Sequence, residues 1–306
     1  MRFFLRFALA FVAIITLMLS IFYTPDLSLE YLISKYTDEE SHFVPIDGMN
    51  VHFKDEGKGC PIILLHGIGS SLHTWDIWAN SLKKNYRVIR LDLPGFGLTG
   101  PHPKKDYSMN NFTDFLNKFL LKIKVDTCYM AGNSMGGAIA WNYSIKYTSV
   151  KKMALIDAVG YPIYKSNFFL IGLCRIPLIN KGVKFYTPMF MTKLTLQTLY
   201  GNKNKIDNLL VNRYRDLLLR PGNRQAFIDA ACEDWYSSNK NISKVNVPTF
   251  IQWGEEDYTI PVEHALKFKN DILNSKIKIY RNVGHMPMEE AGAATIADFQ
   301  NFLIKN

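Results

Sequence analysis

The sequence predicts an α/β protein with a mostly parallel sheet and helices on both faces. Short apolar runs alternate with amphipathic segments from residue 61 to residue 156, and this alternation is typical of a parallel sheet. One of the runs ends in a Gly-x-Ser-x-Gly motif at residues 132–136. The chain has 306 residues, of which 48% are hydrophobic, so it can bury a large core, which excludes disordered and fibrous proteins.

Ser134 lies at the tip of a tight turn between a strand-like run and a helical segment. A serine at such a turn adopts a strained backbone conformation, and Gly132 and Gly136 allow strand and helix to approach closely. The backbone N–H groups that follow Ser134 face any negative charge that develops nearby. This turn is typical of a nucleophilic serine. A Gly-rich turn with a solvated serine has the same five residues, so the rest of the chain must distinguish these two interpretations.

Residues 1–25 resemble a membrane segment more than part of the folded body. Residues 7–25 form an uncharged run of 19 residues, which as a helix is just long enough to cross a bilayer. Bulky side chains, with no small-x-small cleavage pattern, follow Leu19, so we expect a retained anchor rather than a signal peptide. The alternative is a secreted protein. No Cys lies in or just after the run, so lipoprotein processing is not indicated.

The charges on either side of that run predict its orientation. Arg2 and Arg6 precede it, whereas Asp26 and Glu30 follow it before the next base, Lys35. By the positive-inside rule, the N-terminus stays in the cytoplasm. We therefore expect a single N-terminal transmembrane helix with the catalytic domain on the extracytoplasmic side, periplasmic or extracellular.

The remaining chain divides into a linker and a core with an inserted cap. Residues 26–41 suggest a short helix or stalk, and residues 42–160 the first part of the core. Residues 161–245 contain successive helical segments with no clear strand and predict a helical cap. Residues 246–306 complete the core.

The expected elements follow from apolar periodicity and turn signals. In the core we expect a hairpin at residues 42–48 and 50–55, strands at 61–65, 86–91, 128–133, 152–156, 249–253 and 276–280, and helices at 75–84, 109–122 and 289–304. In the cap we expect helices at residues 168–173, 189–200, 206–219 and 224–232.

Most of the chain's net charge of +9 lies in the predicted cap, where residues 162–245 hold 13 Lys and Arg against 5 Asp and Glu. Solvated helix surfaces are the ordinary explanation of such charge. For a membrane-tethered protein, the basic cap is also a candidate contact with anionic head groups. No nucleic-acid partner is expected, and the sequence does not give the oligomeric state.

Four cysteines, Cys60, Cys128, Cys174 and Cys232, lack the spacing of metal ligands. Free, core-packed thiols are the first expectation. A disulfide between Cys174 and Cys232 is the alternative in an oxidising compartment.

A serine at its ordinary pKa needs a base to activate it, and the base needs an acid to orient it. His285 follows the last strand in a Gly-His loop and is the candidate base, whereas His66 is expected to be structural. Asp257, in Trp-Gly-x-x-Asp after the preceding strand, is the candidate acid, with Asp157 as the alternative. Ser134 and these candidates follow strands, and reactive groups gather at the carboxyl ends of parallel strands.

A tetrahedral intermediate needs hydrogen-bond donors for its oxyanion. The backbone N–H groups of Ile68, in the Gly-rich loop of residues 66–71, and of Met135, directly after Ser134, are the expected donors. Loss of one such donor typically costs about a hundredfold or more in rate.

The ordered motifs resemble those of the α/β-hydrolase superfamily, in its capped esterase, lipase and carbon–carbon hydrolase branch. They are, in order, His-Gly-Ile-Gly at residues 66–69, Asp-Leu-Pro-Gly-Phe-Gly at 92–97, Gly-Asn-Ser-Met-Gly-Gly at 132–137, Trp-Gly-Glu-Glu-Asp at 253–257, and Gly-His at 284–285. The resemblance covers residues 42–306 and implies an eight-stranded sheet, a Ser134–His285–Asp257 triad, an oxyanion hole at Ile68 and Met135, a helical cap, and neither cofactor nor metal. Haloalkane dehalogenases and epoxide hydrolases of this superfamily carry an aspartate nucleophile, so Ser134 argues against both activities.

The expected activity is hydrolysis of carboxylic esters, with a small-molecule or lipid ester as substrate. An apolar acyl chain is expected because the predicted cap is rich in large apolar side chains, although packing within the cap also explains them. They include Phe168, Phe169, Phe185, Met189, Phe190 and Met191. Alternatives with the same triad are carbon–carbon bond hydrolysis and cofactor-free perhydrolysis. A catalytically silent binding protein on this fold is a third alternative.

Overall fold

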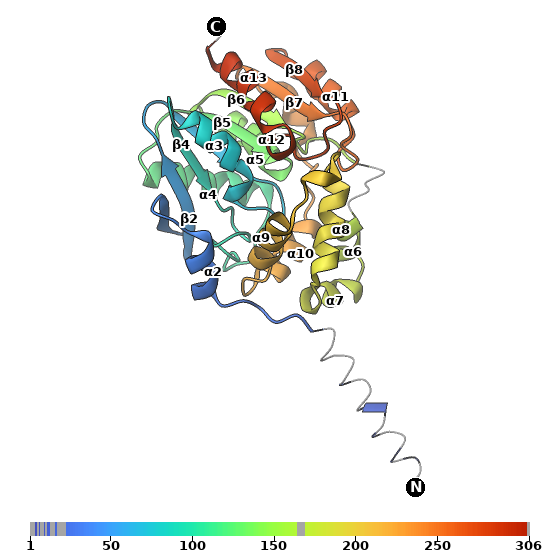
Figure 1. The fold of residues 1–306 in the computed structure, drawn as a ribbon. Helices are drawn as coiled ribbons and strands as arrows, with labels where there is room; N and C mark the ends of the chain where they lie inside the picture. Colours follow the sequence, from blue (N-terminus) through green and yellow to red (C-terminus); the bar gives the residue numbers. More distant parts are fainter. Residues whose placement is uncertain are drawn as a thin grey trace.

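The computed structural model describes residues 4, 6, 9, 11, 12, 16, 23–163 and 169–304. Its centre is an eight-stranded sheet in the order β1-β2-β4-β3-β5-β6-β7-β8. The β1–β2 and β2–β4 pairs are antiparallel, and the other five neighbouring pairs are parallel. Helices cover the sheet, and those between β6 and β7 gather on one side of it (Figure 1). The predicted mostly parallel eight-stranded sheet is confirmed.

The strands form where the sequence has short apolar runs. Ile62, Ile63, Leu64 and Leu65 are all fully buried, as a central strand covered on both faces requires. The strands are β1 Ser41–Ile46, β2 Met49–Glu56, β3 Pro61–Leu65, β4 Arg87–Leu91, β5 Cys128–Asn133, β6 Val150–Ile156, β7 Thr249–Gly254 and β8 Ser275–Tyr280.

Several helices lie outside the connection between β6 and β7. They are α2 Leu29–Tyr36, α3 Asp76–Leu82, α4 Met109–Lys122, α5 Met135–Lys146, α11 Glu263–Asp271, α12 Pro287–Glu290 and α13 Gly292–Ile304, with a 3₁₀ turn η1 at Leu72–Trp75. The single closing helix expected at residues 289–304 is wrong, because the chain breaks at Ala291 between α12 and α13. A Cβ at Gly292 would lie 2.6 Å from Ile77 Cγ2, so the second helix begins where its backbone packs closely on α3.

Between β6 and β7, the described residues form helices and no strand. We call this region, residues 161–245, the cap. Its helices are α6 Phe169–Cys174, α7 Ile179–Phe185, α8 Met189–Leu199, α9 Asn208–Leu218 and α10 Asn223–Cys232, with 3₁₀ turns η2 Lys203–Lys205 and η3 Asn239–Lys244.

The segment expected as a short helix or stalk forms α2, and this helix packs against the body. Leu32 is fully buried in a small cluster with Leu98 and Leu217. Lys35 and Tyr36 both donate hydrogen bonds to Asp216 Oδ2 of the cap helix α9, at 2.7 and 2.9 Å. These contacts tie the start of the folded chain to the cap.

The four cysteines are all free. Cys128 and Cys174 are buried as expected, but the expectation that all four pack in the core is wrong, because Cys60 and Cys232 are exposed. The alternative of a bond between Cys174 and Cys232 does not hold either, although Cys232 Sγ lies 3.7 Å from the carbonyl oxygen of Cys174. Most of the uncharged run at residues 7–25 lies outside the described residues, and no described helix is both long and apolar enough to span a bilayer.

Candidate active site

Ser134 sits between the end of β5 and the start of α5 with a strained backbone, φ 54° and ψ −118°. A positive φ is uncommon for a non-glycine residue, and such strain clusters at functional sites. A Cβ on Gly132 would lie 2.2 Å from the carbonyl oxygen of Gly136, and one on Gly136 would lie 2.2 Å from that of Leu65. The prediction that side chains at these two positions would collide with the backbone is confirmed.

His285 and Asp257 form a hydrogen-bonded pair at the ends of the neighbouring strands β7 and β8. His285 Nδ1 lies 2.7 Å from Asp257 Oδ2, and both side chains are buried. The other carboxylate oxygen of Asp257 accepts hydrogen bonds from the backbone N–H groups of Thr259 at 2.8 Å and Ile260 at 3.0 Å. With Nδ1 donating to Asp257, the tautomer leaves His285 Nε2 free to take up a proton.

A cavity beside Ser134, which we call the main cavity, is lined by four of the five predicted site residues. The fifth, Asp257, contacts His285 but does not line the cavity. Ser134, His285, Ile68 and Met135 all line this cavity, which has a volume of about 110 Å³. Its walls are mostly apolar, from the core and from the cap. Other lining residues include Ile163, Ile171, Leu199, Trp235 and Ile260. The arrangement can hold an apolar group beside a serine hydroxyl, an imidazole and the two loops expected to donate to an oxyanion.

Asp157, the alternative acid, ends β6 beside the Asp257–His285 pair. It is fully buried, its Oδ1 accepts a hydrogen bond from Gly254 N at 3.0 Å, and its Oδ2 has no hydrogen-bond partner among the described residues. Burial, together with the negative charge of Asp257, raises the pKa of Asp157 well above its ordinary value. It is Asp257, and not Asp157, that is hydrogen-bonded to His285.

The same three side chains are the one group of possible metal ligands found among the described residues. Ligand atoms of Asp157, Asp257 and His285 all lie within 4.8 Å of one another. The Asp257–His285 hydrogen bond already uses one atom of each, and the raised pKa of Asp157 favours its neutral acid, whereas a metal ligand must be deprotonated. These protonation states suit a hydrogen-bonded Asp257–His285 pair better than a metal site.

Two residues that the sequence analysis did not single out fix the histidine loop. Asn133, next to the nucleophile, donates from Nδ2 to the carbonyl oxygen of His285 at 3.1 Å. Glu290 Oε1 accepts from the backbone N–H of Gly284 at 2.9 Å, and the N–H of His285 donates to the carbonyl oxygen of Leu199 in the cap at 2.6 Å. The loop that carries His285 is thus held from the turn at Ser134, from α12 and from α8.

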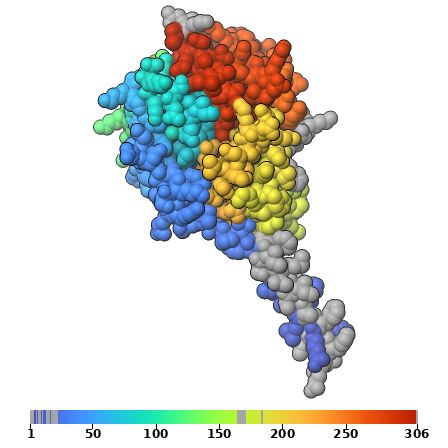
Figure 2. Space-filling model, in the orientation of Figure 1, coloured from blue at the N-terminus to red at the C-terminus, as the bar shows by residue number. Residues whose placement is uncertain are grey.

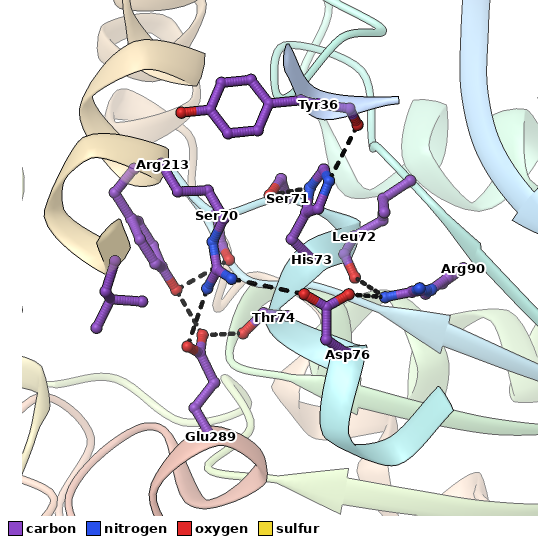
Figure 3. Close-up of polar contacts among 12 residues, drawn as sticks. Tyr36, Ser70, Ser71, Leu72, His73, Thr74, Asp76, Arg90, Arg213 and Glu289 are labelled. Carbon is purple, nitrogen blue, oxygen red and sulfur yellow. Dashed lines mark hydrogen bonds and ion pairs between the residues drawn. The ribbon is translucent and has the colours of Figure 1, made fainter. Parts of the chain in front are cut away.

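A polar cluster joins the cap to the core beside this site (Figure 3). Glu289 of α12 accepts hydrogen bonds from Tyr214 at 2.9 Å and from Arg213 at 3.0 Å, both on the cap helix α9, and a further one from Thr74. Tyr214 also lies 3.2 Å from Ser70 Oγ, in the loop that carries Ile68. No short motif marks Glu289, Arg213 or Tyr214, because their partners lie far away in the sequence.

His66 has the structural role expected of it. It is fully buried, with Nδ1 lying 2.8 Å from the carbonyl oxygen of Gly67 and Nε2 accepting from the N–H of Leu93 at 2.9 Å. Burial lowers its pKa, so it remains neutral and ties the oxyanion loop to the turn after β4.

A second apolar cavity adjoins the first. Both cavities are lined by Ile68, Leu199 and Tyr214, and the second extends along α8 to Tyr186 and Met191. Its other lining residues include Thr187, Thr192, Thr195, Leu196, Leu218 and Phe227.

The apolar cap residues expected to line an acyl site mostly do not do so. Met191 lines the second cavity, but Phe185, Met189 and Phe190 are exposed at the surface of the cap. That part of the expectation is wrong, and so is their placement in the packed interior of the cap. Phe168 and the side chain of Phe169 lie outside the described part of the chain.

The chain is similar to several known hydrolases. A 2-hydroxy-6-oxo-6-(2'-aminophenyl)hexa-2,4-dienoic acid hydrolase from Metapseudomonas resinovorans is 30% identical over 260 residues, 81% of this chain and 85% of that protein. Monoacylglycerol lipase ABHD6 of Bos taurus is 28% identical over 258 residues, 79% of this chain and 74% of that protein. A crystal structure of a membrane phospholipase A, called a bacterial virulence factor, matches with a TM-score of 0.76 and 26% identity, covering 97% of each chain. The family model of the α/β hydrolase fold matches residues 61–292, and this protein therefore belongs to the α/β-hydrolase family.

Proposed function

We propose that this protein is a serine hydrolase that cleaves carboxylic esters through an acyl-enzyme. The observation that carries the proposal is the 2.7 Å contact between His285 and Asp257, with His285 lining the same cavity as the strained Ser134. A nucleophile, a base and an orienting acid are the groups that acyl transfer requires. The hydrolases among its relatives, which include a monoacylglycerol lipase, support the same class of reaction.

In the first half-reaction, Ser134 Oγ attacks the ester carbonyl carbon while His285 Nε2 takes the hydroxyl proton. The negative charge on the carbonyl oxygen is met by the backbone N–H groups of Ile68 and Met135. The bond to the alcohol oxygen then breaks, and the alcohol leaves with the proton from His285. In the second half-reaction His285 deprotonates a water molecule, which attacks the acyl group, and Ser134 regains its proton as the carboxylic acid leaves.

We further propose that the acyl group is apolar and that the protein is anchored to a membrane by residues 1–25. Support for the acyl group comes from the apolar walls of the two adjoining cavities, because a cavity of that kind removes a hydrocarbon chain from water. Support for the anchor comes from the uncharged 19-residue run and from the match to a membrane phospholipase A across 97% of both chains. The arginines before the run favour an extracytoplasmic catalytic domain.

A second candidate reaction is hydrolysis of a carbon–carbon bond in a dienoic acid. It is favoured by the 30% identity to a hydrolase of such acids and by Arg175, the one Lys, Arg, Asp or Glu among the described residues that line the main cavity. A guanidinium at that place can pair with a substrate carboxylate. Competing assays on a dienoic acid and on an ester of similar size separate the two reactions, and loss of dienoic acid hydrolysis in Arg175→Met would support the second.

The test of the main proposal is a series of p-nitrophenyl esters from acetate to palmitate. We expect kcat/KM to rise from acetate to a medium or long acyl chain, because each buried methylene is worth roughly 0.8 kcal/mol. A sharp optimum at acetate would count against the apolar acyl group. Absence of hydrolysis across the whole series would contradict the proposed ester cleavage. It would favour the dienoic acid reaction or a catalytically silent binding protein.

A further inference from the structure

The cap carries bulky apolar side chains on its outer surface in the stretch of residues 176–194. Their exposed fractions run from 42% to 75%, and exposed apolar side chains that gather on one surface mark contact with a partner or a membrane. They are Ile176, Leu178, Ile179, Phe185, Met189, Phe190 and Leu194. We call this surface the cap face.

The stretch of sequence that carries the cap face has charges of one sign. Residues 158–206 contain 7 Lys and Arg and not one Asp or Glu. Lys181 and Lys184 of α7 and Lys193 of α8 are exposed, and Lys193 follows Phe190 by one helical turn, so the two lie on the same side of α8. Apolar side chains interleaved with lysines complement a surface that is apolar within and negative outside, which describes an anionic bilayer.

The folded chain begins beside the cap face. The N–H of Thr24 donates to the carbonyl oxygen of Phe185 at 2.8 Å, and the N–H of Thr187 donates to Thr24 Oγ1 at 3.1 Å. Arg224 of α10 donates to the carbonyl oxygen of Thr24 at 2.9 Å. In Figure 1 the blue segment before α2 reaches the end of the molecule at which α7 lies, and in Figure 2 it borders the yellow-green surface of the cap. The uncharged run that ends at Pro25 therefore meets the body at this face.

The second cavity leads from this face toward the nucleophile. Tyr186, Met191 and Thr192 line that cavity and are only half-buried, and they adjoin the exposed Phe185 and Phe190 in the sequence. At its inner end the cavity shares Ile68 and Tyr214 with the cavity that holds Ser134. A hydrocarbon chain that entered beside α8 would thus stay among apolar walls as it approached the site.

We propose that the cap face rests on an anionic lipid bilayer, with the lysines of α7 and α8 at the head groups and Phe185 and Phe190 below them. The second cavity then admits the acyl chain of an ester directly from the membrane. This inference rests on the proposed ester hydrolysis and anchor. It adds the surface that faces the lipid and the route by which the acyl chain enters.

The test places an environment-sensitive fluorophore at single cysteines of the full chain. Cys60→Ser and Cys232→Ser remove the exposed thiols, and Phe190→Cys carries the label. The matched control is Leu273→Cys, since Leu273 is 91% exposed and lies between α11 and β8. The protein is reconstituted in phosphatidylcholine vesicles with about one third phosphatidylglycerol, and quenching by aqueous iodide is measured.

We expect iodide to quench the label at position 190 at least about fivefold less than the label at position 273, with blue-shifted emission. In pure phosphatidylcholine, or with Lys181→Gln, Lys184→Gln and Lys193→Gln together, this protection falls by half or more. Equal quenching at the two positions would overturn the proposal. Protection that appears in detergent as protein concentration rises, and not in vesicles, would assign the face to a second copy of this chain and would equally overturn it.

Ester hydrolysis by the same labelled protein separates this proposal from the one on which it rests. If the label is protected but neither p-nitrophenyl butyrate nor a long-chain ester is cleaved, the cap face stands and the proposed activity fails. If both esters are cleaved but the label stays open to iodide, the activity stands and the cap face fails. For the route itself, Thr195→Trp, which fills the second cavity, is expected to lower kcat/KM for long acyl chains at least about tenfold relative to butyrate, and an unchanged ratio would contradict it.

Discussion

The core and the cap meet at one cavity but differ in how tightly the backbone is constrained. In the core, a Cβ on Gly132, Gly136 or Gly254 would lie 2.0 to 2.2 Å from a backbone carbonyl oxygen. In the cap, a Cβ on Gly172 or Gly182 would meet nothing within 4 Å. The proposed catalytic groups thus lie beside closely packed backbone, whereas the cap helices α6 and α7 leave open space at their glycines.

The largest effect is expected for His285, the proposed base. His285→Gln removes the proton acceptor but keeps a side chain of similar size, so kcat should fall by about 10⁴-fold or more while thermal stability stays near that of the wild type. His264→Gln is the control, because His264 lies on α11 and is not among the residues lining the main cavity. Activity of the His264 variant should stay within about threefold of the wild type, and a comparable loss in both variants would deny His285 its role.

The contrast between core and cap glycines gives the next effect. Gly132→Ala forces a methyl group against the carbonyl of Gly136, which cannot move without shifting α5, so we expect a loss of about 3 kcal/mol or more in the free energy of unfolding. Gly182→Ala, within α7, should instead stabilise the protein by up to about 1 kcal/mol, because alanine favours a helix and finds open space there. Denaturant unfolding of both variants measures the difference. Similar losses at the two positions would erase the distinction between core and cap.

The polar cluster between cap and core should have an intermediate effect. Glu289→Gln keeps an acceptor but removes the charge that faces Arg213, so the free energy of unfolding should fall by about 2 kcal/mol. The comparison is Lys146→Met, which breaks the exposed ion pair with Asp114 and should cost less than about 1 kcal/mol. Equal, small losses for both variants would mean that the cluster does not hold the cap in place.

The smallest effect concerns the pH dependence contributed by Asp157. Its pKa is raised in the folded protein by burial and by Asp257, so above the ordinary pKa of an aspartate the folded state binds more protons than the unfolded state. The stability that this group contributes is thus complete at low pH and is lost as pH rises through the raised pKa. Asp157→Asn has no proton to lose, and we expect it to gain about 1 kcal/mol relative to the wild type between pH 4 and pH 8 in thermal unfolding. Parallel stability curves would contradict a neutral Asp157.

The sequence was enough to predict the sheet and the candidate triad because their signals are local. Ser134, Asp257 and His285 each follow an apolar run directly and stand beside a glycine or a short motif. The choice of Asp257 over Asp157 followed from its position one strand before His285. That neighbourhood in the sheet is what brings their side chains to 2.7 Å.

Contacts between distant segments could not be predicted in the same way. Tyr214 and Glu289 are 75 residues apart in the sequence, and Lys35 of α2 contacts Asp216 across 181 residues. The outward direction of Phe190 could not be predicted either, because α8 has apolar residues on several sides and its periodicity does not mark one buried face. The break at Ala291 lies where Gly292 approaches Ile77 closely. Because these two residues are far apart in the sequence, the pattern of residues 289–304 alone does not predict the break.

We propose that Ser134, His285 and Asp257 act as one catalytic unit. The most direct test of this proposal is labelling of the full chain with a fluorophosphonate, followed by mass spectrometry of the modified peptide. We predict one adduct, on Ser134, formed at a rate that falls by orders of magnitude in His285→Gln and to a lesser extent in Asp257→Asn. An adduct on another residue, or a labelling rate on Ser134 that ignores the loss of His285, would contradict the account.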